Sequence, residues 1–484
     1  MKLPFLKKKP AEPSAIPMTK QQIIPKGVSS HVRTREEIYT QARLKTELDE
    51  PALPISPEVT AFLQRHGQAP EQLDMAALTA SFRSAMEAGL CGEGGLPMMP
   101  TYLSDAGTLP GETPVAVLDA GGTHLRAAVV STHNGSTLVT QSETLPLPGS
   151  TAPVSWEDFI AASVDLLEPR LDEVRHIGVC FCYPAEATPE HDLRVQTMTK
   201  EVRISGCEGQ LVCASLAAEL KRRGRTGFTF TALNDTAAAL LLGKTTIPPR
   251  YASGFAGMVM GTGMNTCCVL PAERIPKLGQ SEAGARMLVN LESGSFTDVP
   301  QGDFDRALDA ASENPGAYLF EKMISGRYLG ELCRLALAAA AEEGLFSSDA
   351  AEKLRALETL SSETADRFAA DPACGAIEAL AGTSEQDRAI AREIITALFR
   401  RAARAVTANV VALVLLVGKP VERYKPLIIC VDGSLYNNSL LMHDSIADAM
   451  RDFALQEMGV YSVCKGVEQA TLTGTAAAAL LHQS

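Results

Sequence analysis

The chain has few aromatic residues and a single tryptophan. Phe, Trp and Tyr make up 5% of its 484 residues, whereas hydrophobic residues as a whole reach 46%. A core of this composition must be mainly aliphatic. With 21% charged residues, the chain has the make-up of an ordinary globular protein, and its length allows two or three domains.

Positive charge is also in short supply. The chain has 44 Lys and Arg against 57 Asp and Glu, a net charge of −13. A nucleic-acid-binding protein needs a basic face for the phosphate backbone, so this balance argues against nucleic acid as a partner. It does not argue against a nucleotide, because a few N–H groups and one metal ion set the field around bound phosphates.

Long apolar runs and targeting signals are missing as well. No segment reaches the ~18 uninterrupted apolar residues of a membrane helix. The start, MKLPFLKKKP, has lysines but no apolar run after them, unlike a secretory signal peptide. We therefore expect a cytoplasmic protein without a membrane span.

The 11 cysteines form no CxxC pair, so the ligand spacing of a zinc site is missing. Small buried thiols in a reducing compartment are the expected state. In an extended strand Cys180 and Cys182 would share one face, whereas Cys267 and Cys268 would point to opposite faces.

Strands and helices alternate along most of the chain, which indicates an α/β fold. Two segments look alike: residues 114–130 (PVAVLDAGGTHLRAAVV) and 254–270 (GFAGMVMGTGMNTCCVL) each have an apolar strand, a Gly-rich turn with Thr, and a second apolar strand. Neither turn matches the P-loop pattern GxxxxGK[ST] or the dinucleotide pattern GxGxxG. The similarity is a weak internal duplication.

Both Gly-rich turns suit phosphate, because a backbone without Cβ atoms can approach it closely. In the first turn, Asp119 at the strand end can hold magnesium directly or through water, and Arg126 adds positive charge for a phosphate oxygen. A plain hairpin turn is the alternative, since Asp and Gly favour turns for steric reasons. Two such turns in one chain can clamp one polyphosphate from two sides.

A third candidate, Asn234-Asp235-Thr236, lies where a strand gives way to an Ala- and Leu-rich helix. A carboxylate fixed there can act as a general base if it is within hydrogen-bond reach of its proton. All three residue types are also preferred helix N-caps. From these residues alone, capping and catalysis are equal alternatives for Asp235.

Longer runs carry a resemblance to a known family, the hexokinases. LDAGGTHLR resembles their first phosphate motif, LNDT the motif of their catalytic base, and VDGSLY their adenosine motif. The other similar runs are MGTGMN (260–265), MMPTYL (98–103), TK-x-x-x-x-SGCEG (199–209) and NPGAYLFEKMISGRYLGELCRL (314–335). The resemblance covers residues 55 to 480, approximately.

The resemblance implies two actin-like (ribonuclease H-like) α/β domains that flank a ligand cleft, with a helical N-terminal extension. The expected divisions are a disordered tail (1–34), a helical segment (35–95), a small α/β domain (96–233, completed by about 470–484) and a large α/β domain (234–469). The implied activity is ATP-dependent phosphorylation of a hexose, first of all glucose, at the 6-hydroxyl. The products would be hexose 6-phosphate and ADP, as in the first step of glycolysis.

The family roles transfer residue by residue. Asp235 would take the proton of the sugar hydroxyl, and Lys200 would stabilise charge on the transferred phosphoryl group. The implied sugar ligands are Thr199, Lys200, Asn234, Asp235, Asn265, Glu292 and Glu321. The implied ATP ligands are Asp119, Gly121, Gly122, Thr123, Arg126, Gly261, Thr262, Gly263, Gly433 and Ser434, with Mg²⁺ near Asp119.

Four positions depart from the family pattern. His124 stands where hexokinases usually have Asn, and Cys182-Tyr183-Pro184 replaces Ser-Phe-Pro at the sugar loop. Glu292 lacks the usual Trp after it, and ATLTGTAA replaces GSGKGAA near the end. These departures bear on the choice of sugar and nucleotide more than on the reaction class. A sugar-binding regulator without catalysis and an actin-like ATPase of another kind are the alternative functions.

Overall fold

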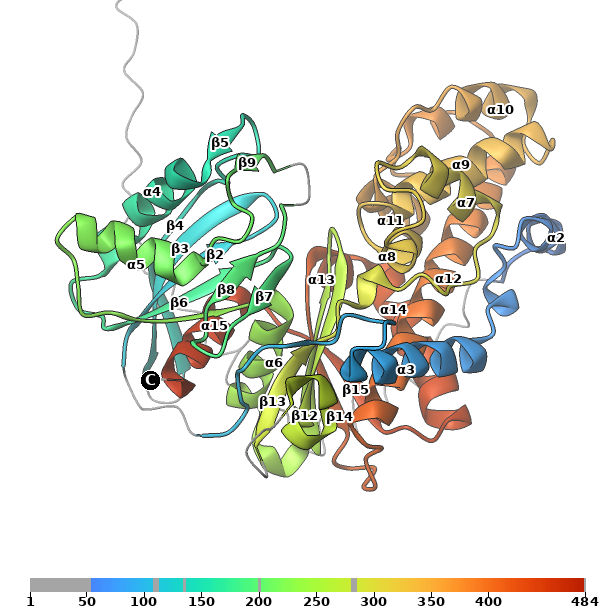
Figure 1. Cartoon of the computed structure of the whole chain (residues 1–484). Coiled ribbons are helices and arrows are strands. Elements are labelled where there is room, and N and C mark those ends of the chain that lie inside the picture. Colours follow the sequence, from blue (N-terminus) through green and yellow to red (C-terminus); the bar gives the residue numbers. More distant parts are fainter. Residues whose placement is uncertain (1–53, 108–112, 134–135, 199–201, 280–284, 483–484) are drawn as a thin grey trace, which may run out of the picture.

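The structure, a computed structural model, describes residues 54–107, 113–133, 136–198, 202–279 and 285–482. The predicted tail and the first part of the predicted helical segment lie outside these residues. The described part of that segment forms α2 (Pro57–Arg65) and α3 (Met75–Cys91), separated near Gly67. Two lobes follow, each built on its own sheet (Figure 1).

The smaller lobe contains a five-stranded sheet of order β10-β6-β2-β3-β4. Strands β2, β3 and β4 are antiparallel neighbours, whereas β6 and β10 run parallel to β2. Every residue of β2 is buried, as expected for a central strand. The bounds are β2 (Val115–Ala120), β3 (His124–His133), β4 (Ser136–Pro146), β6 (His176–Phe181) and β10 (Thr229–Leu233), with α4 (Trp156–Leu167) and α5 (Val212–Arg222) packed beside them.

The larger lobe contains a six-stranded sheet of order β1-β13-β12-β11-β14-β15. Its strand β1 (Met99–Pro100) pairs with β13, although residues 96–233 were predicted to belong to the small domain. This backbone pairing therefore places residues 99–100 in the larger sheet. The other strands are β11 (Gly254–Met260), β12 (Met264–Pro271), β13 (Arg286–Asn290), β14 (Leu427–Asp432) and β15 (Ser462–Gly466).

The two sheets share one plan. The order β4-β3-β2-β6-β10 in the smaller lobe corresponds to β13-β12-β11-β14-β15 in the larger lobe, with three antiparallel strands followed by two parallel ones. The predicted duplication of two Gly-turn hairpins is confirmed, and it extends to all five core strands. The fold is the predicted two-domain, actin-like α/β arrangement.

Two helices, α6 (Asp235–Thr246) and α15 (Ala470–Leu481), join the lobes. Helix α6 follows β10 of the smaller sheet but packs on β11 of the larger one, while α15 follows β15 and packs on β6 and β2. The two helices also pack on each other, and their buried residues are mainly small. A Cβ on Gly474 would lie 1.9 Å from the carbonyl oxygen of Ala238, so only glycine permits this approach.

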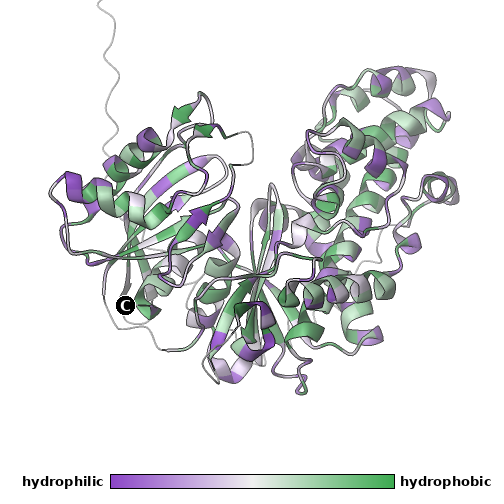
Figure 2. Ribbon diagram, in the orientation of Figure 1, coloured by the Kyte–Doolittle hydropathy of each residue, from purple (hydrophilic) through white to green (hydrophobic). Residues whose placement is uncertain are grey.

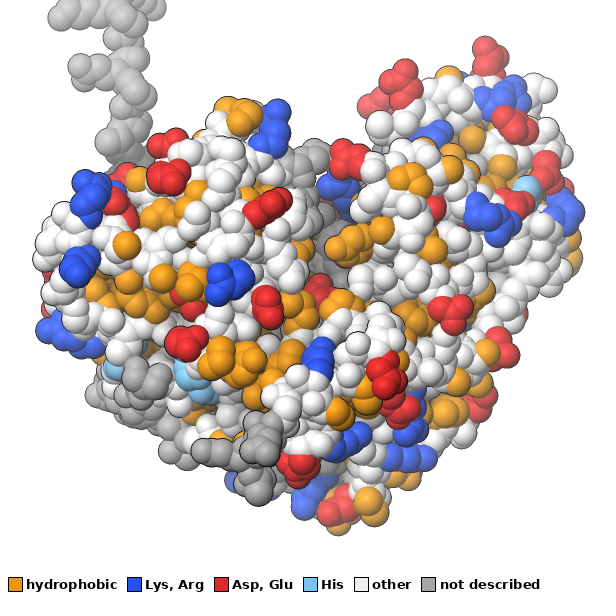
Figure 3. Space-filling model, in the orientation of Figure 1, with side chains coloured by type: hydrophobic (Ala, Val, Ile, Leu, Met, Phe, Trp, Pro, Cys, Tyr) orange, Lys and Arg blue, Asp and Glu red, His pale blue; other side chains and the backbone are white. Residues whose placement is uncertain are grey.

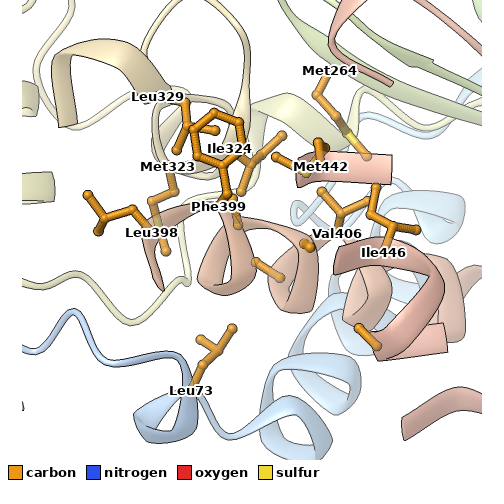
Figure 4. Close-up of a cluster of buried hydrophobic side chains, with 14 of the residues drawn as sticks. Leu73, Met264, Met323, Ile324, Leu329, Leu398, Phe399, Val406, Met442 and Ile446 are labelled. Atoms are coloured by element: carbon orange, nitrogen blue, oxygen red, sulfur yellow. The ribbon is translucent and has the colours of Figure 1, made fainter. Parts of the chain in front are cut away.

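The helical part of the larger lobe surrounds the 33-residue α12 (Glu385–Val417). Figure 4 shows its aliphatic core, in which Phe399 of α12 lies close to Met323, Ile324 and Leu329. Figure 2 shows hydrophobic residues concentrated along the central strands and hydrophilic residues at the outer end of α5. The remaining helices here are α7 (Asp303–Ala311), α8 (Leu319–Ile324), α9 (Leu329–Glu342), α10 (Ser348–Arg355), α11 (Ser362–Ala370), α13 (Ser434–Asn438) and α14 (Leu440–Ala449).

Among the helices of the described residues, none combines the length and hydropathy needed to span a membrane. None of the eleven cysteines, all of which the structure describes, forms a disulfide, and only Cys91 and Cys374 are exposed. Cys180 and Cys182 lie on one face, with their sulfur atoms 3.8 Å apart. Cys267 and Cys268 belong to two different core clusters, as their alternation in β12 predicts.

Candidate active site

The predicted base stands at the first residue of α6, directly after β10. Asn234 is the N-cap, and its Oδ1 accepts hydrogen bonds from the backbone N–H (3.0 Å) and the hydroxyl (2.7 Å) of Thr236. Oδ1 of Asp235 accepts a hydrogen bond from the same N–H at 2.8 Å, and its Oδ2 bonds to no described residue. Because Asn234 supplies the cap, Asp235 has an oxygen available for another partner.

A chain of polar side chains runs from this helix start into the larger sheet. Oδ1 of Asn290 accepts a hydrogen bond from Nδ2 of Asn265 (3.0 Å) and lies 2.8 Å from the Thr236 hydroxyl, whose single proton is shared between Asn290 and Asn234. The Asn265 amide also donates to Oε1 of Glu292 at 2.9 Å, and Asn290 donates to the same oxygen. The structure thus brings together three of the predicted sugar ligands, Asn234, Asn265 and Glu292.

Glu292 is held at the end of this chain in a left-handed backbone conformation, with φ +57°. Burial raises the pKa of its carboxyl to about 7. Hydrogen bonds from Asn265 and Asn290 oppose that rise, whereas the nearby charge of Asp235 adds to it. Glu292 therefore changes its charge near neutral pH.

Glu321, on α8, approaches the second Gly-rich turn. Its Oε2 accepts a hydrogen bond from the backbone N–H of Met264 at 2.9 Å. A Cβ on Gly263 would lie 2.6 Å from the same oxygen, so a side chain there would displace the carboxylate. Glycine at 263 thus leaves room for the carboxylate of Glu321, a predicted sugar ligand, in this position.

The first Gly-rich turn, between β2 and β3, closes with a hydrogen bond from the N–H of Gly121 to the carbonyl of His124 (3.0 Å). Gly122 follows, and Thr123 and His124 are exposed, with 2.8 Å between Oγ1 and Nδ1. The hydroxyl of Tyr183 donates to the carbonyl of Gly121 at 2.8 Å. The sugar loop and the first phosphate turn are therefore directly connected.

The second turn, Gly261-Thr262-Gly263, lies against the start of α13. A Cβ on Gly261 would lie 3.5 Å from both the Cα of Gly433 and the backbone nitrogen of Ser434. Gly433 has φ +116°, and a Cβ there would lie 2.4 Å from the carbonyl oxygen of Met260. The structure thus joins the predicted phosphate and adenosine residues of the larger lobe, with Thr262 and Ser434 exposed.

Asp119 is the last residue but one of β2 and is only 3% exposed. Its Oδ2 accepts hydrogen bonds from the Thr471 hydroxyl (2.7 Å) and from the Arg126 guanidinium (3.1 Å), so Arg126 is paired within the site. Its Oδ1 is buried and has no hydrogen-bond partner among the described residues. Burial raises the pKa of this carboxyl against the opposing effects of Arg126 and Thr471. A carboxylate with an unmatched oxygen in such a place fits a cation.

Asp432 is the last residue of β14, much as Asp119 stands one residue before the end of β2. Burial raises its pKa to about 6, the N–H of Gly433 opposes that rise, and the charges of Asp235 and Asp119 add to it. Asp235 also raises the pKa of Asp119. Three carboxylates from three elements therefore act on one another electrostatically at the ends of the two sheets.

The molecule is hollowed between the two lobes, on the side where β9 (Ile204–Ser205) faces α8 and α11 (Figure 3). Helix α13, which begins at Ser434, lies between the smaller lobe and the helical part of the larger lobe in Figure 1. Thr199 and Lys200, predicted to bind the sugar and to stabilise charge, lie outside the described residues.

Sequence reasoning missed Asn290, Asp432 and Thr471. The first two each end a strand after buried apolar residues, Leu288 and Val289 in β13 and Leu427 to Val431 in β14, and a polar residue at that point is a usable signal. No comparable signal marks Thr471, which reaches Asp119 across 352 positions of sequence.

Comparison with known proteins covers most of the chain. Two family models, both described as hexokinase, match residues 59–245 and 255–481. Hexokinase-1 of Schizosaccharomyces pombe is 32% identical over 433 residues, 84% of this chain and 87% of that protein. Hexokinase-2 of Candida albicans is 30% identical over 409 residues, 78% of this chain and 82% of that protein.

A hexokinase from Schistosoma mansoni, solved in complex with glucose, superposes with a TM-score of 0.72. It is 24% identical, and the match covers 87% of this chain and 98% of that one. This structural similarity shows the fold, whereas the family models and the sequence relatives show the family. The chain therefore belongs to the hexokinase family of sugar-phosphorylating phosphotransferases.

Proposed function

We propose that this chain transfers the γ-phosphoryl group of ATP to the 6-hydroxyl of a hexose, glucose first, and releases hexose 6-phosphate and ADP in cytoplasmic glycolysis. One observation carries the proposal: Asp235 begins α6 with one carboxylate oxygen unbonded among the described residues, next to the polar chain that runs from Thr236 through Asn290 to Glu292. Its charge adds to burial in raising the pKa values of Glu292 on one side and of Asp119 and Asp432 on the other. A proton acceptor for phosphoryl transfer must stand between acceptor sugar and donor phosphates.

The sugar side suits a polyol. Each hydroxyl needs both a donor and an acceptor, which the amides of Asn234 and Asn265 and the carboxylates of Glu292 and Glu321 supply. The bond between Asn265 and Glu292, and bonds from Asn265 to Asn290, from the Met264 N–H to Glu321 and from Thr236 to Asn234, orient these groups before the sugar arrives. Thr199 and Lys200 complete the proposed set on family grounds. The glucose bound to the Schistosoma mansoni relative supports glucose as the first candidate.

The phosphate side suits Mg²⁺ with ATP. Asp119, with its unmatched Oδ1, would hold the ion directly or through water, and Asp432 adds negative charge nearby. The ion supplies charge neutralisation on the phosphates. Backbone N–H groups of the turns at Gly121-Gly122-Thr123 and Gly261-Thr262-Gly263, with Gly433 and Ser434, would surround the nucleotide, and Arg126 would add positive charge.

An ADP-release assay with a panel of sugars tests the proposal. We expect ADP to form with ATP and Mg²⁺ in the presence of glucose, and to a differing extent with fructose, mannose and glucosamine. Thermal stabilisation by glucose without ADP release would instead indicate a sugar-binding regulator. ADP release that does not depend on sugar would indicate an ATPase of another kind.

A further inference from the structure

Two thiols, Cys180 and Cys182, lie next to Asp119, the carboxylate proposed to hold magnesium. Asp119 and Cys180 are paired residues on the parallel strands β2 and β6, and Cys182 follows two residues later, so the three side chains share one face. Among the described His, Cys, Asp and Glu residues, these three form the one group whose potential ligand atoms all lie within 4.8 Å of one another. All three residues are buried.

The spacing of the sulfur atoms matches a metal centre. Sγ of Cys180 lies 3.8 Å from Sγ of Cys182. Two thiolates on one tetrahedral zinc ion, each at about 2.3 Å, are about 3.8 Å apart. The thiols therefore need no rearrangement to share an ion. Without metal, the same distance corresponds to a weak hydrogen bond between two protonated thiols.

The third group, Asp119, has an unsatisfied acceptor. Its Oδ1 is buried without a hydrogen-bond partner among the described residues. The whole residue is only 3% exposed, so bulk water has little access to this oxygen. Asp235 and Asp432 act electrostatically on the same carboxyl, so the surroundings favour a cation. Cys182 retains 9% exposure, and it replaces the serine that is usual in the family.

We propose that Asp119, Cys180 and Cys182 form a binding site for a thiophilic divalent cation such as Zn²⁺ or Cd²⁺, and that occupancy of this site inhibits the enzyme. Binding forms two metal–sulfur bonds and one metal–oxygen bond, and it releases the two thiol protons without any change of oxidation state. Water fills the fourth position. Soft thiolates select such ions over Mg²⁺, which prefers oxygen ligands.

Inhibition follows from the shared ligand. An ion held by the two thiolates occupies the Asp119 carboxylate that Mg²⁺ with ATP would use, and it immobilises the sugar loop at Cys182. The proposed inhibition rests on the proposed kinase function, whereas the proposed metal binding does not.

Cobalt(II) is a suitable probe, because a thiolate bound to it gives a charge-transfer absorption in the near ultraviolet. With the metal-free full chain and excess Mg²⁺, we expect one Co²⁺ per chain by equilibrium dialysis, an absorption of two-thiolate intensity, and displacement of the ion by Zn²⁺. Cys180→Ser and Cys182→Ser should each lower the affinity at least tenfold. Cys91→Ser and Cys374→Ser, which remove the exposed thiols, should leave binding and activity unchanged.

The site would be overturned if the wild-type protein gave no Co²⁺–thiolate absorption, or an absorption weaker than that of two thiolates. It would also be overturned if this absorption persisted in both Cys180→Ser and Cys182→Ser, or if it was lost in Cys91→Ser or Cys374→Ser. The wild-type spectrum decides the question even if a serine variant fails to fold. In the ADP assay, micromolar Zn²⁺ should inhibit the wild type and act at least tenfold more weakly on Cys182→Ser. Zn²⁺ binding without inhibition would overturn the proposed inhibition but not the metal site. If the protein shows no kinase activity at all, the Co²⁺ spectrum still tests the metal site.

Discussion

The two sides of the site are built in different ways. On the sugar side, Asn290 and Asn265 link Thr236 to Glu292 through side-chain hydrogen bonds, so the polar groups already have partners. On the phosphate side, the Gly-rich turns offer backbone, and Asp119 keeps a buried oxygen without a partner. The sugar-side groups bond to one another, whereas the phosphate side keeps one buried carboxylate oxygen without a hydrogen-bond partner among the described residues.

The difference follows from the two proposed ligands. A sugar is neutral and replaces water group by group, so its site benefits from donors and acceptors that are oriented beforehand. A polyphosphate arrives with a cation, and that cation can satisfy the Asp119 oxygen that Arg126 and Thr471 leave without a partner. We therefore expect phosphate-side substitutions to affect the use of MgATP, and sugar-side substitutions to affect sugar affinity together with stability.

The largest effect among the residues of the two sides is expected at Asp119. Asp119→Asn keeps the shape and the acceptor for Thr471 but removes the charge, and kcat/KM for MgATP should fall by about 100-fold or more. Glucose binding, measured by thermal shift, should stay within about twofold. An equal loss of glucose affinity would contradict the separation of the two sides.

Asn290→Ala comes next. Removing the amide leaves the Thr236 hydroxyl, the Asn265 amide and the Glu292 carboxylate each without one partner, so stability should fall by about 2–3 kcal/mol. The KM for glucose should rise about tenfold, while the KM for MgATP stays unchanged. Urea denaturation and initial rates measure both effects. The exposed Asn314 offers a control, since Asn314→Ala should change neither.

Glu292→Gln tests the charge at the end of the sugar-side chain. The pKa of Glu292 is about 7 in the folded protein and 4.5 in its ordinary state, so its contribution to stability is present below pH 4.5 and lost as pH rises through 7. The variant should therefore be more stable than the wild type by about 2 kcal/mol at pH 8 and nearly equal at pH 4.5. Urea unfolding at both pH values measures this, and an identical difference at both would contradict the raised pKa.

The smallest effect is expected at Tyr183, which connects the two sides. Tyr183→Phe restores the residue usual in the family and removes the hydrogen bond to the carbonyl of Gly121, worth about 1 kcal/mol. The tightening of ATP binding by glucose should weaken about fivefold, with each ligand's separate affinity little changed. Calorimetric titration of the protein with ATP, with and without glucose, measures the factor by which glucose tightens ATP binding. Undiminished coupling would show that the hydroxyl has no such role.

The sequence predicted the fold well because the strands and turns are local patterns repeated twice. Runs such as VAVLDAGG and MVMGTG encode their elements within a few residues, and the two-domain arrangement followed from the family resemblance. The predicted division already put residues from 234 onward in the large domain and residues 470–484 with the small one, but it did not predict that α6 and α15 pack on each other. That packing depends on close approach at positions such as Gly474 and Ala238, which no periodicity reveals.

The site was predicted less completely. Asn265 and Glu292 were found through motifs, and the structure places them in hydrogen-bond contact. Asn290, which connects them to Thr236, was missed because its function depends on pairing between strands. Thr471 was missed because its contact with Asp119 joins residues from opposite ends of the chain. The roles of all these residues stay predictions until variants are assayed.

The Asp235→Asn variant tests the central claim most directly. Asparagine can keep the hydrogen bond from the N–H of Thr236 to Oδ1, so the helix start should survive, but it cannot accept the proton of a sugar hydroxyl. We predict normal thermal unfolding, glucose binding within a few-fold of wild type, and a kcat lower by about 10²–10⁴-fold. A folded variant that binds glucose and turns over at the wild-type rate would contradict the assignment of Asp235 as the base.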